Sequence, residues 1–148
     1  MALALTSSAF TNQAAIPTKY TCDGEDINPP LAFQNVPQNT KSLALIVDDP
    51  DAPAKVWVHW VVFNIKPDTS QIAEGSLPPG SILGTTDFGK AGWGGPCPPS
   101  GQHRYFFKLY ALDAPLDLQQ GASKEQVEAA MQGHIIEQAE LVGLYQRS

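Results

Sequence analysis

Prolines and glycines recur throughout this chain, and they constrain its fold more than any other feature of the sequence. The 148 residues include 13 prolines and 12 glycines, spread over the whole length rather than gathered in a linker. Proline breaks helices and glycine destabilises them, so such frequent interruptions exclude a helical bundle. A hydrophobic content of 43% at this length suits one hydrophobic core. We therefore expect a mostly β single domain over residues 1–148.

Three segments have the pattern of β-strands. Residues 42–48 form a short apolar run typical of a strand that is buried on both faces. Residues 56–65 are rich in β-branched and aromatic side chains and predict a long second strand, and residues 104–112 repeat the pattern. Strict alternation along the second strand gives one face to Trp57, His59, Val61 and Phe63. The same rule places His103 beside Tyr105 on the third.

The sequence pattern in the last third of the chain predicts two short helices. Ser123 and Gln126 have the spacing of a capping box, which predicts a helix that begins there and ends at Gly133. A second short helix is expected over residues 134–141. Residues 65–102 are dense in glycine and proline, and a loop of that length predicts short strands together with a functional segment.

The composition excludes several classes of function. The net charge is -6 with 16% charged residues, and no cluster of lysine and arginine suits a nucleic acid. No apolar run reaches the roughly 20 residues of a membrane-spanning helix, and the N-terminus lacks the pattern of a signal peptide. We therefore expect a soluble, cytoplasmic protein that does not span a membrane. No motif indicates a cofactor, so none is expected.

The chain has two cysteines, Cys22 and Cys97. They are too few for a disulfide scaffold, and their spacing is not that of a zinc site. The favoured interpretation is two buried thiols in a reducing compartment, and a single bridge between them is the alternative.

Three segments combine polar side chains with a rigid backbone. Asp49 follows the first predicted strand, in a turn that two prolines stiffen and that also holds Asp51. His59 interrupts an apolar row, and His103 ends a Gly/Pro-rich segment whose amides can form an anion-binding nest. The alternatives are a turn whose carboxylates cap amides, a core histidine bonded to a carbonyl, and an ordinary crossover loop.

Several motifs, in chain order, closely resemble the phosphatidylethanolamine-binding protein family. The similarity runs from about Ser8 to Arg147 and is strongest toward the bacterial and archaeal branch, often called Raf kinase inhibitor-like proteins. The motifs are YTCDG at 20–24, NPPL at 28–31, DPDAP at 49–53, the strand with His59 and Asn64, DFG at 87–89, GPCPP at 95–99 and HRY at 103–105.

The resemblance implies an antiparallel β-sandwich with one small pocket for phosphate, acetate or a phosphoethanolamine head group. Carried over position by position, the ligand-binding residues are Asp49, Ala52, Trp57, His59, Gly94, Gly95, Cys97, Pro98, His103 and Tyr105. In this hypothesis His59 and His103 donate hydrogen bonds to the anion, and the loop amides complete the cradle. Asp49 either orients a histidine or accepts from an ammonium or a protonated phosphate oxygen of the ligand. The chain lacks the longer C-terminal helix of the eukaryotic members of the family. The resemblance therefore implies that the pocket binds a head-group-sized anion rather than a whole phospholipid.

Two other functions compete with non-catalytic anion binding. Two histidines and an aspartate could run acid–base hydrolysis or hold a metal, but no activated nucleophile is evident and no metal is expected. The chain could also act through a protein partner, as an inhibitor of a protease or kinase. The chain could also form a homodimer.

Overall fold

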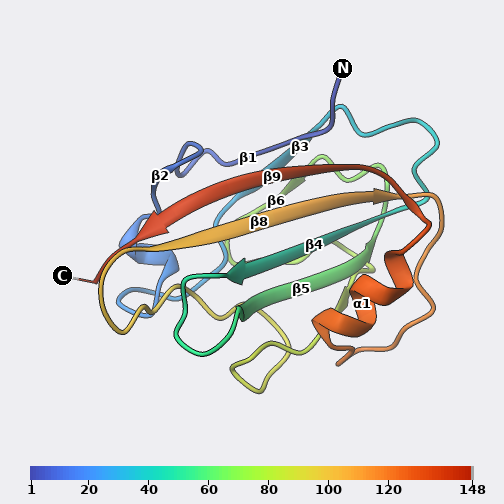
Figure 1. The fold of residues 1–148 in the computed structure, drawn as a ribbon. Coiled ribbons are helices and arrows are strands. Elements are labelled where there is room, and N and C mark those ends of the chain that lie inside the picture. Colours follow the sequence, from blue (N-terminus) through green and yellow to red (C-terminus); the bar gives the residue numbers. More distant parts are fainter. Residues whose placement is uncertain (148) are drawn as a thin grey trace.

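The computed structural model describes residues 1–147 and contains two β-sheets and one α-helix (Figure 1). The large sheet has the order β2-β9-β8-β4-β5-β7, and the small sheet has the order β1-β3-β6. Their strands are β1 (Ala4–Thr6), β2 (Ala14–Ala15), β3 (Leu31–Gln34), β4 (Ser42–Asp49), β5 (Trp57–Ile65), β6 (Gln71–Ile72), β7 (Ile82–Leu83), β8 (His103–Leu112) and β9 (Ile135–Tyr145). Every pairing is antiparallel except the parallel one of β2 with β9. The predicted mostly β fold is confirmed.

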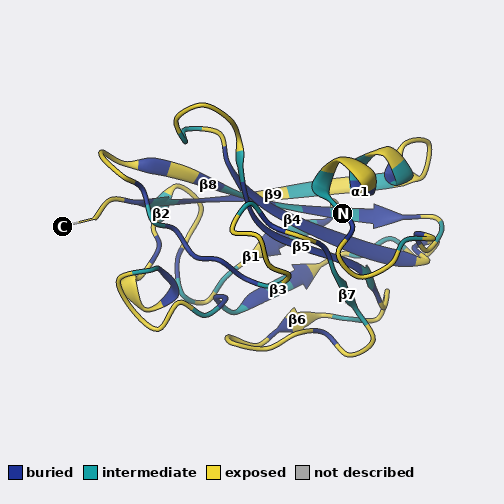
Figure 2. Ribbon diagram, turned by 90° about the horizontal axis from the view of Figure 1, so that it is seen from below, coloured by how far each residue is buried: buried dark blue, intermediate teal, exposed yellow. Residues whose placement is uncertain are grey.

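The central strands β4 and β5 of the large sheet are buried on both faces. Figure 2 shows α1 (Lys124–Met131) on one side of this sheet and strands β3 and β6 on the other. Leu45 and Val47 of β4 pack in the cluster between the sheets, whereas Ala44 and Ile46 pack in the cluster under the helix. Every residue of β4 is buried, which confirms the prediction from its unbroken apolar run.

A bulge changes the side-chain parity of β5. Pairing with β4 shifts between Val47, which pairs with Trp60, and Asp48, which pairs with Val58, so His59 is the extra residue of β5. Such a residue reverses the alternation of the side chains beyond it. Val61 and Phe63 therefore lie in the cluster under the helix, not on the face of His59. The expectation of strict alternation along this strand was wrong.

The C-terminal segment is a strand where a second helix was expected. Gly133 has a φ of 82° and ends the first helical region, as predicted. The predicted helix over 134–141 was wrong, because β9 pairs with β8 from His103 to Leu112. Hydrogen bonding along that whole edge overrides the local helical spacing of the apolar residues. The segment 65–102 does contain short strands, β6 and β7.

Cys22 and Cys97 form a disulfide bridge. The favoured expectation of two thiols was wrong, because the pairing depends on a close approach of two loops that are 75 residues apart in the sequence. Within the described part of the chain, no helix is long and apolar enough to cross a membrane.

Replacing Ser123 by alanine should lower the free energy of unfolding by about 1 kcal/mol. The Ser123 hydroxyl accepts from the amide of Gln126, and the Gln126 side chain accepts from the amide of Ser123, so the predicted capping box is present. Chemical denaturation measures the difference. Ser76→Ala, which removes an exposed hydroxyl bonded to a local carbonyl, is the control. Equal losses in both variants would contradict a specific role for the cap.

Candidate functional site

One end of the large sheet gathers the polar residues singled out from the sequence. Asp49 ends β4 and pairs with Trp57 at the start of β5, while Asp48 pairs with Phe106 near the start of β8. Because neighbouring strands run antiparallel, the end of β4 and the beginnings of β5 and β8 meet at the same edge. A cavity of about 370 Å³ opens there.

The cavity brings together most of the predicted site residues. Its walls contain Asp49, Ala52, Trp57, His59, Cys97, Pro98, His103 and Tyr105, and also Pro53, Phe88 and Pro99. The polar groups are buried, and apolar side chains form much of the rest of the wall. A cavity with a few convergent polar groups among apolar walls is the usual form of a small-molecule site.

Asp49 and His103 form a buried pair in this cavity. The Nδ1 atom of His103 lies 2.7 Å from Oδ2 of Asp49, and both side chains are less than 10% exposed. The other oxygen of Asp49 accepts from the amide of Asp51 at 2.8 Å. With Nδ1 bonded to the carboxylate, Nε2 is the ring nitrogen of His103 left for a ligand.

His59 is oriented by the backbone of the Gly/Pro-rich loop. Its Nδ1 atom lies 2.6 Å from the carbonyl oxygen of Gly94 and donates to it, because a carbonyl can only accept. Burial lowers the pKa of His59 below its ordinary 6.5, against the opposing effects of the Gly94 carbonyl and of Asp49. The ring is therefore neutral at pH 7 and presents the lone pair of Nε2.

Tyr105 adds an unpartnered hydroxyl to the cavity wall. The side chain is 1% exposed, and its hydroxyl has no hydrogen-bond partner among residues 1–147. Burial, reinforced by the negative charge of Asp49, raises the pKa of this phenol far above its usual value, so it remains a donor at every physiological pH. A buried hydroxyl is costly to leave unpaired, so this one favours a polar ligand in the cavity.

Gly94 and Gly95 support the site from behind its wall and do not line it. The amide of Gly94 donates to the carbonyl of His59, and the amide of Gly95 donates to the Asp26 carboxylate at 2.8 Å. Both donors are thus used within the protein, so the amides of Gly94 and Gly95 are not available to an anion. Gly94 is needed because a β-carbon there would lie 2.3 Å from the ring of Phe88.

Three cavity residues were not predicted as site residues, namely Pro53, Pro99 and the aromatic residue Phe88. Its ring packs edge-on against Trp57 and against His59, at centroid distances of 5.8 and 5.2 Å, and it is 41% exposed at the mouth of the cavity. The neighbouring Asp87 fixes this turn by accepting from the amide of Val58 at 2.7 Å. The sequence signal for Phe88 is the DFG motif at 87–89, which is one of the motifs of the family resemblance.

Asp51 lies outside the cavity and links the turn after β4 to Arg104 at the start of β8. Its carboxylate accepts from the backbone amide, Nε and Nη2 of Arg104, which lowers the pKa of Asp51 to about 2. The interpretation of Asp51 as a turn carboxylate that caps a backbone amide agrees with this geometry. Throughout residues 1–147, no group of three His, Cys, Asp or Glu side chains has an arrangement that could hold a metal ion.

Comparison with known proteins identifies the family. Residues 6–146 match the sequence model described as Phosphatidylethanolamine-binding protein. The chain belongs to the phosphatidylethanolamine-binding protein family. It is 58% identical to a protein of Methanothermobacter thermautotrophicus named UPF0098 protein, over 97% of this chain and 98% of that one. This relationship confirms the expected bacterial and archaeal branch of the family.

Solved structures of related proteins have the same fold. The putative phosphatidylethanolamine-binding protein homolog CT736 from Chlamydia trachomatis superposes with a TM-score of 0.96 at 46% identity, over 99% of both chains. Escherichia coli YbcL, described as a new member of the mammalian family, superposes with a TM-score of 0.93 at 32% identity, over the whole of both chains. The expected architecture for this branch is therefore confirmed.

Proposed function

We propose that this protein binds a small phosphate-like anion, such as phosphate or a phosphoethanolamine-type head group, and acts without catalysis in a regulatory or inhibitory role. One observation carries the proposal. The cavity holds two buried imidazoles, and the Nδ1 atom of each already has a hydrogen-bond partner in the protein. Beside them lies the Tyr105 hydroxyl, which has no partner among residues 1–147. Tyr105 can donate to an anionic oxygen, and each Nε2 can accept from a protonated oxygen or donate once its ring is protonated.

The remaining cavity residues favour binding over chemistry. None of the lining residues is a serine, threonine or lysine, and the one cysteine, Cys97, is held in a disulfide. Covalent catalysis needs an activated nucleophile, and the wall supplies none beyond the histidines themselves. Asp49 is bonded to His103 and to the Asp51 amide, so it orients a ligand-binding group.

Phosphate affinity is expected to rise as the pH falls from 8 to 6. His59 is neutral in the free protein because burial lowers its pKa, and contact with an anion raises that pKa in the complex. A group whose pKa rises on binding takes up a proton, so affinity increases with acidity, by up to about tenfold per pH unit for one proton, and levels off below the pKa of the free protein.

Titration calorimetry with inorganic phosphate, repeated in buffers of different ionisation enthalpy, measures both the affinity and the proton uptake. His59→Gln should weaken binding and flatten the pH profile. His134→Gln is the matched control, because that histidine is exposed, bonds Asp113 at 2.7 Å and lies outside the cavity. Absence of phosphate binding at pH 6, or binding indifferent to His59→Gln, would reject the proposed function.

A further inference from the structure

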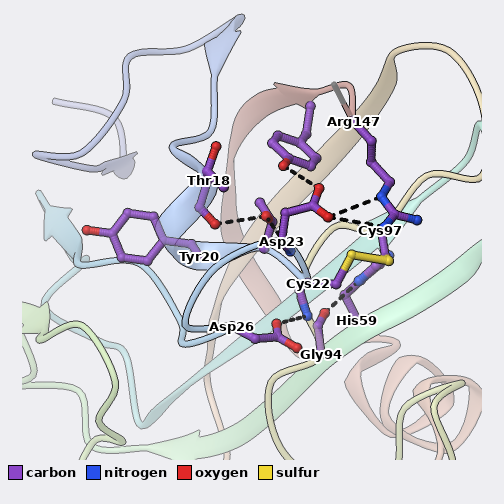
Figure 3. The surroundings of a disulfide bond; sticks show 12 residues. Thr18, Tyr20, Cys22, Asp23, Asp26, His59, Gly94, Cys97 and Arg147 are labelled. Atoms are coloured by element: carbon purple, nitrogen blue, oxygen red, sulfur yellow. Dashed lines mark hydrogen bonds and ion pairs between the residues drawn. A yellow bond between two sulfur atoms is a disulfide. The ribbon is translucent and has the colours of Figure 1, made fainter.

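The disulfide bridge is part of the cavity wall. Cys97 lines the cavity and is partly exposed, while Cys22 follows the short 3-10 helix Thr18–Tyr20 in the N-terminal region. Figure 3 shows the bridge close to the hydrogen bond between Gly94 and His59. The same covalent link therefore joins the wall of the site to a segment 75 residues earlier in the chain.

Hydrogen bonds and burial also hold this loop in place: residues 93–96 are buried, and the Gly94 amide donates to the His59 carbonyl at 3.0 Å. Residues 93–101 contain no helix or strand, and the prolines at 96, 98 and 99 have no amide hydrogen to donate. Three hydrogen bonds tie the loop to the N-terminal segment: Trp93 Nε1 to the Tyr20 carbonyl at 3.2 Å, the Cys22 amide to the Pro96 carbonyl at 3.1 Å, and the Gly95 amide to Asp26 at 2.8 Å. The disulfide bridge is the covalent link between the loop and this segment.

The position of the loop determines the orientation of a ligand-binding histidine. The Gly94 carbonyl holds Nδ1 of His59 at 2.6 Å, and Gly94 is three residues from Cys97. If the loop moves, the ring of His59 loses the acceptor that fixes its tautomer and its direction. A pre-organised site binds more tightly than one that must first be ordered, because ordering costs free energy.

We propose that the redox state of the Cys22–Cys97 bridge controls the affinity of the cavity for its anion. The oxidised protein has the ordered, high-affinity cavity. Two equivalents of a small thiol reduce the bridge to two cysteine thiols and form one disulfide of the small thiol, so two electrons and two protons are transferred to the protein. The freed loop then no longer orients His59. This inference rests on the proposed function, since it names the regulation of the same site.

Linkage makes the coupling reciprocal. If the bridge tightens phosphate binding by a given factor, then bound phosphate must make the bridge harder to reduce by the same factor. We attribute the weaker binding of the reduced protein to loss of loop order.

Calorimetry with inorganic phosphate on oxidised protein and on protein reduced with dithiothreitol tests the proposal. Reduction should weaken binding at least about tenfold, and reoxidation should restore it. Cys22→Ser should bind as weakly as the reduced protein and should not respond to dithiothreitol. The double variant Cys22→Ser/Cys97→Ser should behave the same way, since loop order and not thiolate charge is at issue. Equal affinities in the oxidised and reduced proteins would overturn the inference.

A second measurement tests the reciprocal effect. The fraction of oxidised protein is determined by thiol alkylation and mass spectrometry at fixed ratios of reduced to oxidised glutathione, with and without saturating phosphate. Phosphate should shift the midpoint toward the disulfide by the factor found in calorimetry.

The outcomes separate the two proposals. If the oxidised protein does not bind phosphate, the proposed function fails. If it binds but the midpoint does not move, only the redox coupling fails. Loss of the whole tertiary structure on reduction at low temperature, seen by NMR, would also overturn the coupling, because the bridge would then hold the fold and not the site.

Discussion

Replacing Asp49 by alanine is expected to abolish measurable phosphate binding and to lower the free energy of unfolding by about 2–4 kcal/mol. Asp49 accepts from Nδ1 of His103 and from the amide of Asp51, and its side chain is only 4% exposed. Alanine leaves both donors without a partner in the interior. The buried donors then cost their full desolvation free energy, and the ring of His103 loses the contact that directs Nε2.

The negative charge of Asp49 would itself repel an anion. We expect this repulsion to be smaller than the gain from the orientation of His103. Both carboxylate oxygens already accept hydrogen bonds, one from the amide of Asp51 and one from the imidazole of His103. Asp49→Asn keeps the size of the side chain, so we expect it to lose phosphate binding with a smaller loss of stability. The two variants together separate the orientation of His103 from the packing at this position.

Asp113→Ala is the matched control for Asp49→Ala. Asp113 bonds Nδ1 of His134 at 2.7 Å, the same distance as in the buried pair, but both side chains are about half exposed. An exposed pair contributes little, so its removal should change stability by less than about 1 kcal/mol and leave phosphate binding intact. Calorimetry and chemical denaturation on both variants make the comparison. Phosphate binding by Asp49→Ala at wild-type affinity would contradict the assigned role.

Local pattern was sufficient to predict the elements that position these residues. The unbroken apolar run of β4 indicated a strand that is buried on both faces, and the Ser123 capping box marked the start of α1. Both signals are local, since they depend on neighbours within a few residues along the chain. For the same reason His103 and Tyr105 were correctly placed on one face of β8, which has no bulge between them.

The errors arose where distant segments decide the structure. The bulge at His59 depends on the pairing of β5 with β4, and β9 is a strand because the edge of β8 is available to it. The Cys22–Cys97 bridge likewise depends on two loops that approach each other only in the folded chain. Sequence periodicity carries no information on these contacts.

The role of the Gly/Pro-rich loop could not be read from its composition. Glycine permits a backbone amide to approach a ligand, but it equally permits the backbone to pack against another segment. In the structure the second use applies at Gly95, whose amide bonds Asp26. The choice between them depends on the position of the segment around residues 20–26, which no local pattern reveals.

Replacing Gly95 by alanine is expected to destabilise the protein by about 2–4 kcal/mol and to weaken phosphate binding at the same time. A β-carbon at this position would lie 2.3 Å from Oδ1 of Asp26 and 2.5 Å from the backbone oxygen of Tyr20. The Asp26 side chain can move, whereas the Tyr20 backbone cannot do so cheaply. The loop must therefore shift away, which lengthens the bond from Gly95 to Asp26 and displaces the adjacent carbonyl of Gly94 from His59.

Gly101→Ala is the control within the same loop. Its φ of 69° penalises alanine by about 1 kcal/mol, but nothing lies within 4 Å of the added β-carbon, and Gly101 is not part of the cavity wall. It should therefore lose some stability while retaining wild-type phosphate affinity. Denaturation and calorimetry on the two variants distinguish steric displacement from backbone strain. Equal effects of both substitutions on phosphate affinity would show that the contact of Gly95 with the N-terminal segment does not position His59.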